Sequence, residues 1–203
     1  MKKQIMEKMD FSNSRMTIRK NGFSINEVMI SMFVLSVGIV TVIGLFSKGF
    51  INSALDRDRI VAAGLAQEGV ELVKNVRDNS FAKGDADGFV HFVASSDYCR
   101  VSYDSSASAM DCSNNSGDRP ASNLARYTLS LNGGYYKHMD SDSAKFSRYI
   151  DVDYNNGQKT ADVVSFVYWG GTIPSDIENG NVTNCHIGNK CVYSKVRLEN
   201  WKP

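Results

Sequence analysis

Residues 19–49 read RKNGFSINEVMISMFVLSVGIVTVIGLFSKG. From Val28 to Ser47 this stretch holds 20 residues without a formal charge, most of them Val, Ile, Met, Leu or Phe. As a helix these residues would span about 30 Å, the thickness of a bilayer's hydrocarbon core. A buried helix of a soluble protein would normally keep a polar face over five turns. A cleavable secretory signal would have a shorter apolar run, of about 7–15 residues. The sequence therefore predicts a membrane-spanning helix over about residues 28–47.

The charges are unevenly distributed along the 203 residues, although the formal net charge is only +1. Residues 1–22 carry six of the 23 Lys/Arg and two of the 22 Asp/Glu, which leaves 17 basic and 20 acidic residues, a net charge of −3, for the rest. Because basic flanks stay in the cytoplasm, residues 1–22 are predicted to lie inside and the remainder to be exported from a single-pass membrane protein. The mildly acidic remainder argues against nucleic acid as a partner.

A helical pattern continues beyond the apolar run. No proline, which would end the helix, occurs before Pro120. Apolar and small residues recur at spacings of three, four or seven, which predicts one helix from about Phe23 to about Arg77. Its second half is expected to be amphipathic, with small residues that let a sheet or another helix approach closely. The residues of this stripe are Ile51, Leu55, Ala62, Leu65, Ala66, Gly69, Leu72, Val73 and Val76.

After Asn79 the sequence changes to β-branched and aromatic segments separated by turn residues. The turn sequence NNGQKTA favours a hairpin, and short loops between successive strands favour an antiparallel sheet. The Ser/Asp/Asn-rich residues 104–123 are predicted to form an exposed loop. Strands are expected at residues 89–94, 99–103, 126–132, 147–154, 162–169 and 191–200.

The four cysteines Cys99, Cys112, Cys185 and Cys191 would lie on the exported side, where an oxidising compartment favours disulfides. Three connectivities are possible, and loop entropy favours the short pairs Cys99–Cys112 and Cys185–Cys191. The alternative is a metal site in CHIGNKC, where His186 lies between two thiols. That spacing does not match the usual zinc patterns, so we expect disulfides and no metal.

Glu27 is the single carboxylate at the edge of the apolar run, four residues after Phe23 and five after Gly22. A glycine at position 22 would let a protease approach the backbone closely. A cut between Gly22 and Phe23 would create a positive amine one helical turn from Glu27. Since an unpaired carboxylate in hydrocarbon costs several kcal/mol, Glu27 could pair with that amine or with the amine of a neighbouring copy. The alternative is a carboxylate that simply extends toward water.

The segment GFSINEVMISMFVLSVGIV resembles the leader-cleavage and N-methylation segment of type IV prepilins. LAQEGVELVKNVRD and the ending VRLENWKP are similar to minor pilins and pilin-like proteins. The resemblance implies that a prepilin peptidase cuts after Gly22 and methylates the amine of Phe23, and that Glu27 sets subunit registry in a filament. One departure is Gly44, where major pilins often have a helix-breaking proline.

The resemblance and the patterns together predict an α+β pilin-like fold, a long N-terminal helix packed against an antiparallel β-sheet head. Residues 1–22 would be the leader, 23–78 the helix, and 79–203 the head with its disulfides. The implied partners are the peptidase and methyltransferase, other pilin subunits, the pilus assembly machinery and membrane lipid. The protein would reside in the cytoplasmic membrane and then in an extracellular or periplasmic filament.

The sequence leaves several functions open beside a pilus subunit, of which a pseudopilin of a type II secretion system is the nearest. An exported hydrolase is disfavoured, because no G-x-S-x-G, H-E-x-x-H or Walker pattern occurs and the histidines His91, His138 and His186 have no evident nucleophile or metal partner. We therefore expect no catalytic residue and no cofactor. A membrane-tethered adhesin would use exposed head residues, for which Tyr135, Tyr136, Lys137 and Arg148 are the candidates.

Overall fold

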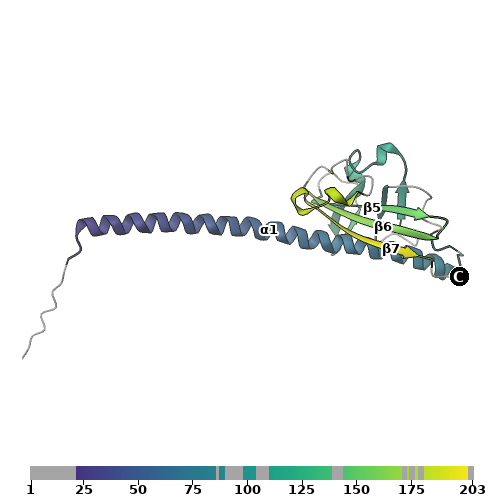
Figure 1. Cartoon of the computed structure of the whole chain (residues 1–203), viewed down its shortest axis with the longest axis horizontal. Helices are drawn as coiled ribbons and strands as arrows, with labels where there is room; N and C mark the ends of the chain where they lie inside the picture. The colour runs from purple at the N-terminus through teal and green to yellow at the C-terminus, as the bar shows by residue number, and fades with distance from the viewer. Residues whose placement is uncertain are drawn as a thin grey trace, which may run out of the picture. The chain divides into compact units, whose positions relative to one another are not determined.

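The computed structural model describes residues 22–85, 87–89, 98–103, 110–138, 144–170, 173, 177 and 181–200. The chain divides into two compact units, Met1–Gly49 and Phe50–Pro203. The helix α1 (Ile25–Lys83) begins in the first unit and ends in the second (Figure 1). The predicted leader, except for its last residue, lies outside the described residues.

Helix α1 ends later than the predicted Arg77, and its end has a clear local cause. Gly84 adopts a φ of +98°, which glycine tolerates without steric cost. The backbone N–H of Gly84 donates to the Phe81 carbonyl at 3.1 Å, and that of Asp85 donates to the Ser80 carbonyl at 3.2 Å. These two bonds form a Schellman motif, which satisfies the last carbonyls of the helix.

Seven strands among the described residues form one antiparallel sheet. The hairpin β5–β6 is its centre, and β7 pairs with β6 along the second part of α1 (Figure 1). The other edge of β5 pairs with β3 at its start and with β1 near its middle, at Ile150, and β4 and β2 extend these two branches. The strands are β1 (Tyr98–Val101), β2 (Met110–Ser113), β3 (Thr128–Asn132), β4 (Tyr135–His138), β5 (Phe146–Asn155), β6 (Thr160–Trp169) and β7 (Cys191–Glu199).

Five of the six predicted strands are confirmed as β1, β3, β5, β6 and β7, and the sixth, at 89–94, lies mostly outside the described residues. The predicted β5–β6 hairpin is also confirmed, and the Asn155 side chain accepts from the N–H groups of Gly157 and Gln158 in its turn. The prediction of a loop over 104–123 is wrong at β2. Its sequence, MDCS, has little strand propensity, and the strand forms because it pairs with β1.

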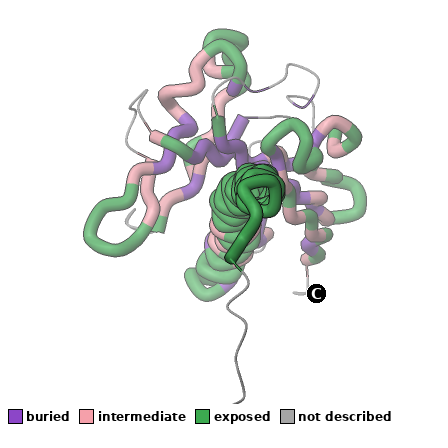
Figure 2. Tube along the Cα trace, turned by 90° about the vertical axis from the view of Figure 1, so that its left-hand side faces the viewer, coloured by how far each residue is buried: buried purple, intermediate pink, exposed green. Residues whose placement is uncertain are grey.

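Two core layers lie on opposite faces of the central strands, since successive side chains of a strand point to opposite faces. On one face Val73 and Val76 of α1 pack with Val163 of β6, and on the other Tyr149 stacks on Phe166 with ring centroids 4.8 Å apart. Figure 2 shows in purple that buried positions gather inside the head. Because α1 supplies part of the core from Ala62 onward, the compact unit begins at Phe50 rather than near residue 79.

The predicted apolar stripe of α1 is buried against the sheet only in its later part. Ala62, Ala66 and Gly69 are buried, and a Cβ at Gly69 would lie 2.3 Å from Ser165 Oγ. The small residues therefore let the sheet approach the helix, as predicted. The earlier positions differ, because Ile51 is 62% exposed.

Arg148 of β5 is fully buried, so its proposed place in an exposed binding surface is wrong. Its Nη1 donates to the Leu65 carbonyl and to Glu68 Oε1, both at 3.1 Å, and its Nη2 donates to the Val101 carbonyl at 2.9 Å. Burial lowers the pKa of Arg148, and the charge of Glu68 opposes that shift. The guanidinium thus joins α1 to two strands. Of the other candidates, Tyr135 is exposed and Tyr136 and Lys137 are half-buried.

Candidate functional site: the amino-terminal segment

The first turn of α1 is organised by Ser24, whose carbonyl accepts the backbone N–H of Glu27 at 3.0 Å and that of Val28 at 3.1 Å. Ser24 therefore occupies the N-cap position, and Glu27 is the third helical residue. This places the carboxylate in the first turn, where the helix dipole and unpaired amides favour negative charge.

The cleavage and methylation residues precede that turn in open positions. Gly22 is exposed, and none of the described residues comes within 4 Å of where a Cβ would stand on it. The Phe23 side chain is 80% exposed. The described part of the chain thus leaves the Gly22–Phe23 bond uncovered, whereas cleavage there stays a prediction.

The apolar part of α1 is not covered by the sheet. Among the described residues, α1 is the one helix long and apolar enough to cross a membrane, and its most apolar window of 18 residues has a mean hydropathy of 2.5 with no buried position. Every residue over 25–51 is exposed, and Figure 2 accordingly colours this part of the helix green. In water, an apolar surface of this size marks contact with membrane or with other protein.

The hydroxyl groups of this segment are satisfied within the helix itself. Ser31 Oγ donates to the Glu27 carbonyl at 2.7 Å, and Thr41 Oγ1 donates to the Gly38 carbonyl at 2.8 Å. Such back-bonding removes the need for water as a partner, which suits a segment in lipid or among helices. Glu27 is the one formally charged side chain between Gly22 and Ser47, so it is the polar group of this segment that still needs a partner.

Comparison with protein-family models, with curated proteins and with solved structures finds no match to this chain. The fold itself is the α+β, pilin-like architecture predicted from the sequence, a long apolar N-terminal helix packed on an antiparallel sheet.

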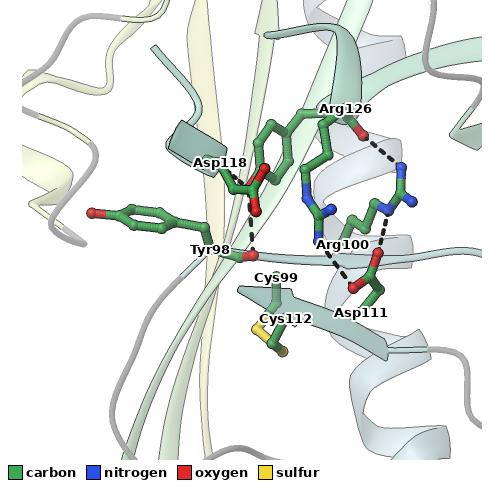
Figure 3. Close-up of a disulfide and its surroundings, with 8 residues drawn as sticks. Tyr98, Cys99, Arg100, Asp111, Cys112, Asp118 and Arg126 are labelled. Carbon is green, nitrogen blue, oxygen red and sulfur yellow. Dashed lines mark hydrogen bonds and ion pairs between the residues drawn. A yellow bond between two sulfur atoms is a disulfide. The ribbon is translucent and has the colours of Figure 1, made fainter. Parts of the chain in front are cut away.

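The head contains both disulfides that the shorter loops favour. Cys99 and Cys112 face each other across β1 and β2, as the close-up in Figure 3 shows, and Cys185 bonds to Cys191 at the start of β7. The CHIGNKC sequence is thus closed by a disulfide. No group of three His, Cys, Asp or Glu side chains suited to a metal ion occurs in the described part of the chain.

Two of the three histidines, His138 and His186, lie in the described part of the chain. His186 is exposed, and His91 lies outside the described residues. The ring nitrogens of His138 are buried, and burial, assisted by the positive charges of Arg148 and Arg100, lowers its pKa to about 3. His138 is therefore neutral at physiological pH and belongs to the packing of the sheet.

Two local signals in the sequence mark the ends of α1 more closely than its apolar pattern does. Ser24 and Glu27 have the S-x-x-E spacing of a capping box, which marks the start of a helix at Ile25 rather than at Phe23. Gly84 directly follows the last turn, where glycine commonly ends a helix.

Proposed function

We propose that this chain is a structural subunit of a type IV pilus or a related filament, matured by a prepilin peptidase and assembled through α1. The observation that carries the proposal is the first turn of α1. It places one carboxylate, Glu27, just after an uncovered Gly22–Phe23 bond and before an apolar segment that the head does not cover.

The apolar segment supports residence in the cytoplasmic membrane before assembly. Its helix needs surroundings that are apolar on every side, which both lipid tails and a bundle of like helices provide. The basic residues 1–22 favour a cytoplasmic N-terminus and export of the head, where the two disulfides suit an oxidising compartment.

Glu27 supports assembly rather than simple anchoring. An isolated carboxylate costs several kcal/mol in hydrocarbon, and a freed ammonium on Phe23 would neutralise it. If the ammonium belongs to a neighbouring subunit, the pair forms only in one axial register of the two helices. The energetic preference for that register would order the subunits.

A pseudopilus of a type II secretion system would use the same first turn and the same helix. No described feature of the head favours a pseudopilin over a pilus subunit. The expected partners are the peptidase and methyltransferase, other subunits, the assembly machinery and membrane lipid.

Mass analysis of the mature N-terminus tests the processing step. We expect the protein to begin at methylated Phe23 in cells that contain the peptidase and to keep residues 1–22 in cells that lack it. A mature protein that retains residues 1–22 in peptidase-containing cells would refute the proposal.

Substitution of Glu27 tests the assembly step separately. Glu27→Gln should leave cleavage intact but strongly reduce recovery of the subunit in sheared filaments. Glu71→Gln is the matched control, because Glu71 is an exposed carboxylate of the same helix that pairs with Lys74 at 2.6 Å. Equal recovery of both variants and wild type in filaments would exclude the registry role.

A further inference from the structure

A cavity of about 240 Å³ lies in the head, lined by Arg100, Asn123, Ala125 and Arg126. Arg100 comes from β1, while Arg126 comes from the short helix η2 (Leu124–Tyr127) that precedes β3. Figure 3 shows both guanidinium groups directed toward Asp111 of β2. Two cationic side chains from separate elements thus line one small cavity.

One carboxylate is shared between the two guanidinium groups. Arg100 Nε donates to Asp111 Oδ2 at 2.8 Å, and Arg126 Nη2 lies 2.9 Å from Asp111 Oδ1. Each guanidinium has five N–H donors, arranged to match the two oxygens of an oxyanion. The carboxylate thus does not use every N–H donor of Arg126.

Arg126 is the more poorly satisfied of the two arginines. Its Nε is buried without a hydrogen-bond partner among the described residues, and its Nη2 meets Asp111 without hydrogen-bond alignment. A buried donor without a partner costs free energy. A further hydrogen-bond acceptor would therefore stabilise the site.

Asp111 is also the most exposed member of the cluster. Its side chain is 52% exposed, against 24% for Arg100 and 16% for Arg126. The carboxylate can thus turn into water while the arginines stay in place. The nearby Asp118 also interacts with both arginines through its charge, while its Oδ2 accepts the Ser113 hydroxyl at 2.6 Å.

The site is built on a fixed frame. The Cys99–Cys112 disulfide joins β1 to β2 one residue from Arg100 and from Asp111, which pair directly across the two strands. Arg100 Nη1 also donates to the Arg126 carbonyl at 3.3 Å, which links β1 to η2. Sites held by rigid elements lose little entropy when a ligand binds.

We propose that this cavity binds a small oxyanion, the carboxylate or phosphate group of a ligand, and that Asp111 occupies the arginine pair when the ligand is absent. The oxyanion replaces Asp111 between the guanidiniums and also accepts from Arg126. The cavity has room for one charged group with part of a sugar ring or a few waters. Filament assembly does not enter this argument, so the two proposals fail independently.

The test is an NMR titration of the full chain, labelled with ¹⁵N, in micelles of an uncharged detergent. Sodium acetate, glucuronate and phosphate are added in turn at constant ionic strength, and the arginine Nε–Hε signals report binding. We expect a saturable shift of the Arg126 signal. Tighter binding of phosphate than of acetate indicates a phosphorylated ligand, and tighter binding of glucuronate indicates an acidic sugar.

Three variants separate binding from structural effects. Arg126→Gln should weaken binding at least about tenfold, the change expected for losing a charge-assisted hydrogen bond. Asp111→Asn should strengthen binding, because the competing carboxylate is gone, and unfolding cannot produce that result. Arg197→Gln, which removes an exposed arginine that pairs with Asp162 on β6, is the control and should bind like wild type.

The proposal is overturned if no anion shifts the Arg126 signal in a saturable way. It is equally overturned if Arg197→Gln weakens binding as much as Arg126→Gln, since the anions would then act by general screening. Unchanged or weaker binding by a folded Asp111→Asn variant would show that Asp111 does not compete for the arginines, and would also overturn it.

Discussion

The close approach of α1 to the sheet at Gly69 predicts how an alanine at this position changes the stability of the protein. A Cβ at Gly69 would lie 2.3 Å from Ser165 Oγ and 3.0 Å from Arg148 Cδ. Gly64 lies in the same helix but is exposed, and no described atom comes within 4 Å of its Cβ position. The two glycines therefore differ in packing but not in secondary structure.

The expected magnitudes follow from two opposing effects. Replacing glycine by alanine inside a helix stabilises by about 1 kcal/mol at either position. Overpacking a tight contact costs about 1–3 kcal/mol, and only Gly69 has such a contact. Gly64→Ala should thus be about 1 kcal/mol more stable than wild type, and Gly69→Ala about 0–2 kcal/mol less stable. The difference between the variants is the overpacking cost alone.

Thermal unfolding of the full chain in uncharged detergent measures this difference, with near-ultraviolet circular dichroism to follow the buried aromatic side chains. For a domain of this size, 1 kcal/mol corresponds to about 2–4 °C in Tm. Adding Ser165→Ala to Gly69→Ala should recover part of the loss, because it removes the nearest atom. If Gly69→Ala stabilised the protein as much as Gly64→Ala does, the helix would not be packed against β6 as described.

Three further predictions concern the head, each measured by denaturant unfolding of the full chain in micelles. Arg148→Ala should lower the free energy of unfolding by about 2–4 kcal/mol and Glu68→Ala by only about 1–2 kcal/mol, because the buried arginine also donates to two backbone carbonyls. Equal losses in the two variants would contradict this explanation. Lowering the pH from 7 to 5 should reduce the free energy of unfolding by about 2 kcal/mol. The reason is that His138, with a pKa of about 3 in the folded protein, stays neutral there, while in the unfolded chain it gains a proton below about pH 6.5. This loss grows as the pH falls toward 3, and His138→Gln should remove it; an unchanged pH dependence would argue against a buried neutral ring. Replacing Cys99 and Cys112 by serine should cost about 2–3 kcal/mol, the loop entropy of their separation of 13 residues, and more than replacing the other pair.

The sequence predicts those elements in which neighbouring residues all favour the same secondary structure. Helix α1 has an uninterrupted helical pattern, and β5, β6 and β7 are rich in β-branched and aromatic residues with turn signals between them. Two short cysteine loops likewise favour the pairing that the structure has. In each case the physical cause lies within a few residues along the chain.

The features that escape prediction depend on contacts far apart in the sequence. Strand β2 forms against β1 although its own sequence suits a loop, and Arg148 is buried because Leu65, Glu68 and Val101 come together around it. The cavity at Arg100 and Arg126 likewise depends on two elements meeting. Only the folded chain brings these groups together, so no local pattern could indicate them.

The two parts of α1 show why the proposed assembly step would depend on a single residue. After Ala62 the helix has one buried face and one charged face, and the sheet of the same chain covers the first. Before Gly49 it is apolar on every side, so lipid or other helices must cover it. Lipid tails and helix surfaces are similarly apolar, so moving Val, Ile, Leu and Phe from bilayer to filament changes their free energy little. Glu27 is the exception, because in the filament its carboxylate would meet the Phe23 ammonium of a neighbouring subunit, which a single subunit in lipid lacks. The transfer should therefore be favourable only where that pair forms, which makes charge removal at Glu27 a stronger perturbation of assembly than any apolar exchange along the same helix.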